Sequence, residues 1–189
     1  MAQTSLNKVS IRLSSGGHSF STVELNASNS VEVAVLTHKT TLVPSELFDD
    51  AHTADYLAEV GLAPSVAERV VASEPMNGIV AVMAISAEVY DELAATGAEL
   101  LFASPLADDA ALQRGTLLHL EDDVLYVRHY CDSLKFAEAF ECRADADVLY
   151  YLATVNEVYD IYNMSARARG EVQRLKRVCK GLFKELLCE

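Results

Sequence analysis

The sequence lacks the cysteine pairs that bind zinc or crosslink small secreted domains. It has four cysteines in 189 residues, Cys131, Cys142, Cys179 and Cys188, and none belongs to a Cys-x-x-Cys pair. The first five residues also lack the basic start and apolar centre of a secretory signal. We therefore expect a cytoplasmic protein whose cysteines are reduced thiols.

Long apolar runs and basic residues are scarce as well. No apolar run approaches the roughly 20 residues of a membrane-spanning helix, so no membrane association is expected. The net charge of −13 argues against nucleic-acid binding. Residues 1–166 carry −17 and residues 167–189 carry +4. Such a basic tail can dock on the acidic body, bind an acidic partner or solvate a helix face.

About half of the residues are apolar, which predicts a real core, and their spacing predicts its elements. Period-2 alternation at the start, with Gly16-Gly17 as a turn, predicts a three-stranded antiparallel meander. The elements that follow are expected at 49–60 (helix), 64–74 (helix), 79–85 (central strand), 86–96 (helix), 99–103 (strand) and 105–113 (short helix). The strand at 79–85 is apolar on both faces, a pattern typical of parallel sheets.

The opening pattern then repeats. Strands are expected at 116–120, 124–130 and 134–140, followed by a helix that begins at Asp145. Residues 166–187 are predicted to form one basic amphipathic helix with a buried face of Val172, Leu175, Cys179, Leu182 and Leu186. The predicted order is βββ-α-α-β-α-β for a first unit, 1–114, and βββ-α-α for a second, shortened unit, 115–189.

Two such units resemble the actin-like ATPase fold, an α/β fold that is ribonuclease H-like in each half. The segments Val9–Ser14, Gly17–Ser21 and above all Leu36–Phe48 are similar to an uncharacterised bacterial family with an actin-like ATPase fold and no known function. The resemblance implies two more parallel strands after residue 163. The second domain is therefore either truncated or a small sheet covered by two helices, and a partner can cover the edge left open.

The resemblance also implies where a nucleotide would bind. In actin-like ATPases the first hairpin loop contacts phosphate through backbone N–H groups, beside a carboxylate that serves the metal. Here the two corresponding turns hold Gly16 and Gly17, and Glu121, Asp122 and Asp123. The strand-end carboxylate of the first hairpin and the family's glycine pair for adenosine are missing, and no P-loop is present. We interpret the ATP site as absent.

Other constellations are equally weak. With Asp122-Asp123 as a two-residue turn, His119 and His129 point to opposite faces of the sheet, so one zinc ion cannot bind both with Cys131 and Cys142. No recognisable catalytic motif occurs, and the paired acids at 49–50, 108–109 and 145/147 suit helix dipoles. We assign no metal, cofactor or catalytic residue. The sequence leaves enzymatic activity undecided and favours its absence.

Three hypotheses of function remain. The leading one is a non-catalytic binding or scaffold protein with an actin-like fold. The alternative is a divergent nucleotide-binding protein that uses Gly16, Gly17, Glu121, Asp122 and Asp123. The second alternative is a self-assembling structural protein, so a homo-oligomer or an unidentified protein partner is expected.

Overall fold

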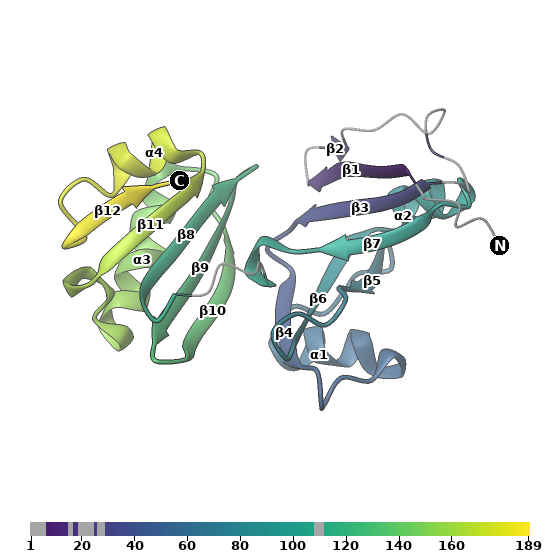
Figure 1. Ribbon diagram of the computed structural model, residues 1–189, viewed down its shortest axis with the longest axis horizontal. Helices are drawn as coiled ribbons and strands as arrows, with labels where there is room; N and C mark the ends of the chain where they lie inside the picture. Colours follow the sequence, from purple (N-terminus) through teal and green to yellow (C-terminus); the bar gives the residue numbers. More distant parts are fainter. Residues whose placement is uncertain (1–6, 15–16, 19–24, 26–28, 108–111) are drawn as a thin grey trace. The chain divides into compact units, whose positions relative to one another are not determined.

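The computed structural model describes residues 7–14, 17–18, 25, 29–107 and 112–189 (Figure 1). The chain divides into two compact units, residues 1–107 and 108–189. The sequence pattern had placed the boundary after residue 114. Each unit is a mixed α/β structure with its own hydrophobic core.

The first unit contains two sheets. Its strands and helices are β1 (Asn7–Ser14), β2 (Gly17–His18), β3 (Asn29–Leu36), β4 (Thr40–Pro44), a 3₁₀ turn (Asp50–His52), α1 (Thr53–Glu59), β5 (Glu68–Ala72), β6 (Ile79–Ser86), α2 (Ala87–Ala95), β7 (Glu99–Ala103) and a second 3₁₀ turn (Pro105–Ala107). The sheet order is β2-β1-β3-β7 in one sheet and β4-β6-β5 in the other.

The predicted antiparallel meander at the start of the chain is wrong. β3 does not return beside β2 but pairs in parallel with β1, from Asn7↔Asn29 to Ser14↔Leu36, and in parallel with β7 on its other side. This central place buries Val31, Val33 and Val35 almost completely. Period-2 alternation reports which residues share a face, but it does not report which strand lies alongside.

The second sheet corrects two further expectations. The predicted helix over 64–74 contains a strand instead, β5, which pairs antiparallel with β6 from Glu68↔Ser86 to Ala72↔Val82. β6 is central and buried on both faces, as predicted, but its neighbours are antiparallel. Its odd-numbered residues, such as Met83, face the core that includes β1, β3 and α2, and its even-numbered ones, such as Val82, face α1.

The second unit is a single five-stranded sheet with helices on one face. Its elements are β8 (Arg114–Glu121), β9 (Val124–Cys131), β10 (Leu134–Glu141), α3 (Asp145–Tyr159), a 3₁₀ turn (Ile161–Asn163), β11 (Ser165–Gly170), α4 (Val172–Val178) and β12 (Glu185–Cys188). The order is β10-β9-β8-β11-β12, with β8, β9 and β10 an antiparallel meander, as predicted, and β8, β11 and β12 parallel.

The second unit contains strands where the sequence analysis expected none, and the single helix expected over 166–187 is wrong. That segment contains β11, the seven-residue α4 and β12, which are the two further parallel strands of the fold. Gly170 and Gly181 have φ of 73° and 77°, a left-handed conformation that interrupts a helix. The expected apolar face is partly right, because Leu175 and Cys179 are buried and Leu182 and Leu186 pack against the same core.

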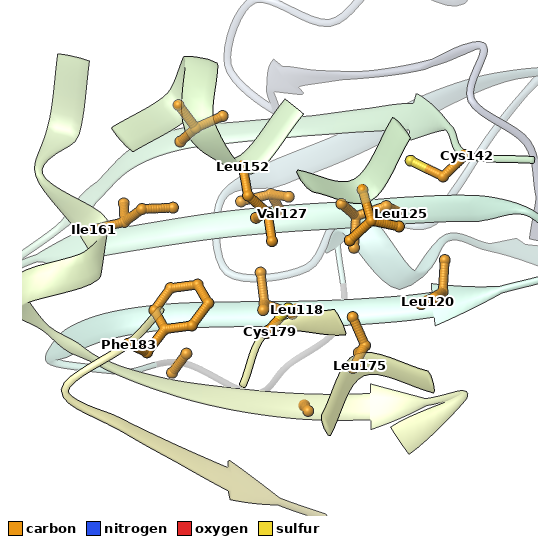
Figure 2. Close-up of a cluster of buried hydrophobic side chains, with 14 residues drawn as sticks. Leu118, Leu120, Leu125, Val127, Cys142, Leu152, Ile161, Leu175, Cys179 and Phe183 are labelled. Carbon is orange, nitrogen blue, oxygen red and sulfur yellow. The ribbon is translucent and has the colours of Figure 1, made fainter. Parts of the chain in front are cut away.

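The core of the second unit lies between its sheet and its helices. Figure 2 shows Leu118, Leu125 and Val127 on the strands pointing toward Leu152 of α3 and Leu175 of α4. These side chains are all fully buried. Burial of each contributes roughly 1.5–3 kcal/mol, so this layer holds both helices to the sheet.

Candidate functional site

The first hairpin can be placed only in part. Leu13 and Ser14 of β1 pair antiparallel with His18 and Gly17 of β2. Gly16 lies outside the described residues, and Gly17 is the first residue of β2.

The second hairpin turn is well defined. Glu121 pairs with Val124, so Asp122 and Asp123 form a two-residue turn, and both have positive φ, 48° and 60°. This is the conformation of a type I′ turn, which matches the twist of the strands and tolerates Asp better than most residues. The turn places three carboxylates, with Glu121, at one end of the sheet.

An arginine from far along the chain neutralises part of this acidic end. The Arg174 guanidinium lies 3.4 Å from Asp123 Oδ1 and 3.4 Å from Glu171 Oε2, and its Nε donates to Asp145 Oδ1 at 2.9 Å. Its Nη2 also donates to the backbone carbonyl of Cys142 at 3.2 Å. Arg174 thereby joins the turn, the start of α3 and α4.

The ion pairs change the acidity of the groups involved. Hydrogen bonds from Arg174 and then from Arg177 hold the pKa of Asp145 below its ordinary value. The hydrogen bond to Asp145 is the main reason that the pKa of Arg174 is raised. Asp145 is thus a carboxylate already paired with two cations, Arg174 at 2.9 Å and Arg177 at 2.8 Å.

The remaining carboxylates offer little to a metal ion. Glu121 Oε2 lies 2.9 Å from His119 Nε2, which leaves Asp122 as the carboxylate of this turn with no partner among the described residues. Mg²⁺ and Ca²⁺ are held by several oxygen ligands, and a neighbouring guanidinium opposes their charge. Across the described ranges, no group of three His, Cys, Asp or Glu residues is placed to hold an ion.

The sheet register confirms that His119 and His129 face opposite sides. His119 pairs with Tyr126 and His129 with Thr116, so the two histidines lie at alternate positions of the pleat. His129 is buried beside α3, where its Nδ1 lies 3.1 Å from the Thr116 hydroxyl and burial lowers its pKa. His129 is therefore a neutral core residue.

The buried cysteines are not reactive. Burial raises the pKa of Cys142 to about 12 and that of Cys179 to about 11. Because the thiolate is the nucleophile, both groups are protonated and inert near neutral pH. All four cysteines are unpaired.

The acidic pairs expected to serve helix starts do so where they are described. Asp49 accepts a hydrogen bond from Ala51 N at the first 3₁₀ turn, and Asp147 accepts one from Ala144 N at the start of α3. Residues 108–109 lie outside the described residues. Arg174 is the residue that the sequence analysis missed, because its partners are 29 and 51 positions away and no local pattern connects them.

Comparison with known proteins agrees with the arrangement of strands. No family model matches the chain, and no curated protein matches its sequence. A protein of Bacteroides thetaiotaomicron, described as having an actin-like ATPase fold and unknown function, superimposes with a TM-score of 0.76 at 17% identity, over 98% of this chain and 91% of that one. The cytoplasmic domain of EpsL, an inner-membrane component of the type II secretion system of Vibrio cholerae, matches with a TM-score of 0.44 at 16% identity, over 85% and 81%.

The first of these similarities confirms the fold expected from the sequence. Because the sequence identity is low, this similarity shows the fold and not the activity. None of the helices in the described part of the chain is long and apolar enough to cross a membrane. The chain has the actin-like ATPase fold.

Proposed function

We propose that this protein is a non-catalytic binding or scaffold protein that uses an actin-like fold without ATPase chemistry. The observation that carries the proposal is the pairing of Arg174 with Asp123, Asp145 and Glu171. A metal–triphosphate complex needs carboxylates and waters free to coordinate a cation. At this turn the Arg174 guanidinium already occupies the place of a cation beside the carboxylates, and the Arg174 side chain is only 16% exposed.

A cytoplasmic location is part of this proposal. All four cysteines are unpaired thiols, which is the usual state in a reducing compartment. The partner that such a scaffold serves is a protein rather than a nucleic acid, because the net charge of −13 opposes a phosphate backbone.

Calorimetric titration of the full chain with ATP and Mg²⁺ tests the proposal. The expected result is no heat of binding above dilution. Binding with a dissociation constant in the micromolar range would overturn it, since about 8 kcal/mol of affinity cannot arise without a site.

The divergent nucleotide-binding alternative predicts instead that the chain binds ATP and Mg²⁺, and that this binding depends on the carboxylates of the second hairpin turn. If Asp122 and Asp123 held a metal, the double change Asp122→Asn and Asp123→Asn would abolish any binding of ATP and Mg²⁺. The matched control is Asp132→Asn, which changes an aspartate in the neighbouring hairpin turn, also with positive φ (62°). Loss of binding in the double variant but not in the control would establish the alternative.

A further inference from the structure

β10 is an edge strand with one side open. It lies at one end of the five-stranded order and pairs with β9 on one side, from Leu134 to Glu141. In the part of the chain that the structure describes, no strand pairs with its other side. An edge of this length presents a row of backbone N–H and C=O groups that another strand can use.

The helix beside this edge presents apolar side chains to solvent. Five aromatic rings form a continuous row in which each ring contacts the next. The distances between ring centroids are 5.3 Å for Tyr150–Tyr151, 4.4 Å for Tyr151–Phe140, 6.4 Å for Phe140–Phe136 and 5.2 Å for Phe136–Tyr159. Tyr150 is 67% exposed, whereas the other four rings are half-buried. A partly exposed cluster of aromatic rings beside an open sheet edge is the kind of surface on which another chain can pack.

Val158 extends this surface along α3. It lies seven positions after Tyr151, two turns along the same side of the helix, and is 72% exposed. Tyr151 stacks on Phe140 of β10, so this side of α3 is the one that borders the open edge. We call the edge of β10 together with Phe136, Phe140, Tyr150, Tyr151 and Val158 the β10 surface.

The sequence of β10 is complementary to itself when two copies run antiparallel about Glu138. Phe136 then lies opposite Phe140 of the second copy, and Ala137 lies opposite Ala139 of the second copy. Lys135, which stands at an irregularity in the pairing of β10 with β9 between Leu134 and Phe136, comes to the end of the junction where Glu141 of the second copy lies, so an opposite-charge pair forms at each end. Aromatic and opposite-charge cross-strand pairs each stabilise a sheet by roughly 0.2–1 kcal/mol.

Glu138 is the exception in this register, because it meets its own copy on the symmetry axis. It lies at alternate positions with Phe136 and Phe140, its side chain is exposed, and partial burial raises its pKa. The other charged groups on its own strand are Lys135 and Glu141, each three positions away. The side chains that share its face of the unit are Phe136, Phe140, Val127, His129, Tyr151, Val155 and Tyr159. His129 is the group among them that titrates near neutral pH, and its lowered pKa keeps it uncharged there.

We propose that the β10 surface is where two copies of this chain associate, with their β10 strands antiparallel about Glu138, and that the charges of the two Glu138 carboxylates oppose this association at neutral pH. A charged side chain on an edge strand is a common means of preventing sheet extension. When the Glu138 carboxylate is neutral, this repulsion is absent and the phenylalanine and Lys135–Glu141 contacts stabilise the dimer. Association therefore strengthens as pH falls toward the titration range of Glu138.

Sedimentation velocity of the full chain tests the surface. At neutral pH and about 100 µM, a concentration at which dimers of moderate affinity are populated, the parent chain is expected to be mainly monomeric. Glu138→Gln should lower the dimer dissociation constant at neutral pH by about tenfold or more, which corresponds to about 1.4 kcal/mol. Working at neutral pH avoids the general loss of solubility near the isoelectric point of about 4.7.

The matched control is Glu59→Gln, which removes the same charge from an exposed position at the end of α1 in the first unit. It should leave the mass distribution of the parent unchanged. Circular dichroism would confirm that both variants remain folded, as expected for exposed substitutions. If Glu138→Gln sediments like the parent, or if both variants dimerise equally, the proposal is wrong.

A charge exchange tests the register. In the Glu138→Gln background, Lys135→Glu and Glu141→Lys should each weaken the dimer, because each places like charges opposite one another. The double variant Lys135→Glu/Glu141→Lys should recover the dimer. Glu141 also pairs with Arg143 at 2.8 Å, and this local pair is lost in the double variant too, so recovery can come only from contacts between copies. A double variant as weak as the single ones would overturn the proposed pairing.

Discussion

Arg174 Nε donates a hydrogen bond to Asp145 Oδ1 at 2.9 Å and so joins α4 to the first turn of α3 across 29 residues of sequence. A carboxylate at the start of a helix also complements the positive end of the helix dipole. The same guanidinium reaches the turn between β8 and β9 through Asp123. One side chain therefore ties together three elements of the second unit.

Loss of Arg174 should destabilise the protein. Arg174→Ala removes contacts with three carboxylates and with the Cys142 carbonyl, and we expect a loss of about 1–3 kcal/mol in the free energy of unfolding. Arg177→Ala is the control, since its side chain is 69% exposed and bonds to Asp145 alone, and it should cost under about 1 kcal/mol. Urea unfolding measures both, and equal losses would mean that Arg174 is an ordinary surface residue.

Gly170→Ala should be far more harmful than Gly181→Ala. Both glycines have nearly the same positive φ, 73° and 77°, so the backbone strain of an added Cβ is similar. At Gly170 that Cβ would overlap the carbonyl oxygen of Leu120, whereas at Gly181 it would meet nothing within 4 Å. The difference in melting temperature between the two variants therefore reports the close approach of β11 to β8, and equal melting temperatures would contradict it.

Leu175→Ala should destabilise the second unit by about 2–5 kcal/mol. Leu175 is fully buried between α4 and the sheet, in the core shown in Figure 2. Leu187→Ala on β12 is the matched control, because Leu187 is 44% exposed, and we expect a change of about 0.5 kcal/mol or less. Chemical unfolding distinguishes the two, and a large effect of Leu187→Ala would show that β12 is covered.

His129 should make stability fall as the solution is acidified below about pH 6.5. Burial lowers its pKa in the folded protein, so the unfolded chain binds a proton first as pH falls through its ordinary value of 6.5. The contribution is present above that value and is lost progressively toward the lower pKa of the folded state. His129→Gln should flatten the dependence of unfolding free energy on pH in this range.

His52 supplies the control for that measurement. It is exposed, and its hydrogen bond to Asp55 raises its pKa, which gives the opposite sign. Its contribution is present below pH 6.5 and is lost as pH rises through the folded value. His52→Gln should therefore leave the acid-induced fall intact, and a flattening equal to that of His129→Gln would contradict the assignment.

Much of the second unit's first half could be predicted from local pattern. The run Glu121-Asp122-Asp123-Val124 lies between two apolar strands, and a two-residue turn sets every pair along β8 and β9 once it forms. The opposite facing of His119 and His129 followed from this register alone. The buried character of β6 was equally visible, because both parities of residues 79–85 are apolar.

The segment from 165 to 188 shows where local pattern was misinterpreted. Ala166 and Ala168 alternate with Arg167 and Arg169, which is the period of a strand, but the apolar spacing farther along favoured a helix over the whole segment. Gly170 and Gly181 were the signals of interruption. A helix of seven residues is stable only because Leu175 is buried by the sheet, and sequence propensity does not contain that contact.

The sequence by itself determined which residues are apolar, how they alternate and where tight turns can form, because these depend on neighbouring residues in the chain. Only the tertiary structure decided that β3 lies beside β1, that Arg174 pairs with Asp123 and Asp145, and that β10 is left with an open edge. All three depend on how segments that are distant in sequence are arranged. The free energy of that arrangement depends on burial and on charges brought together by folding.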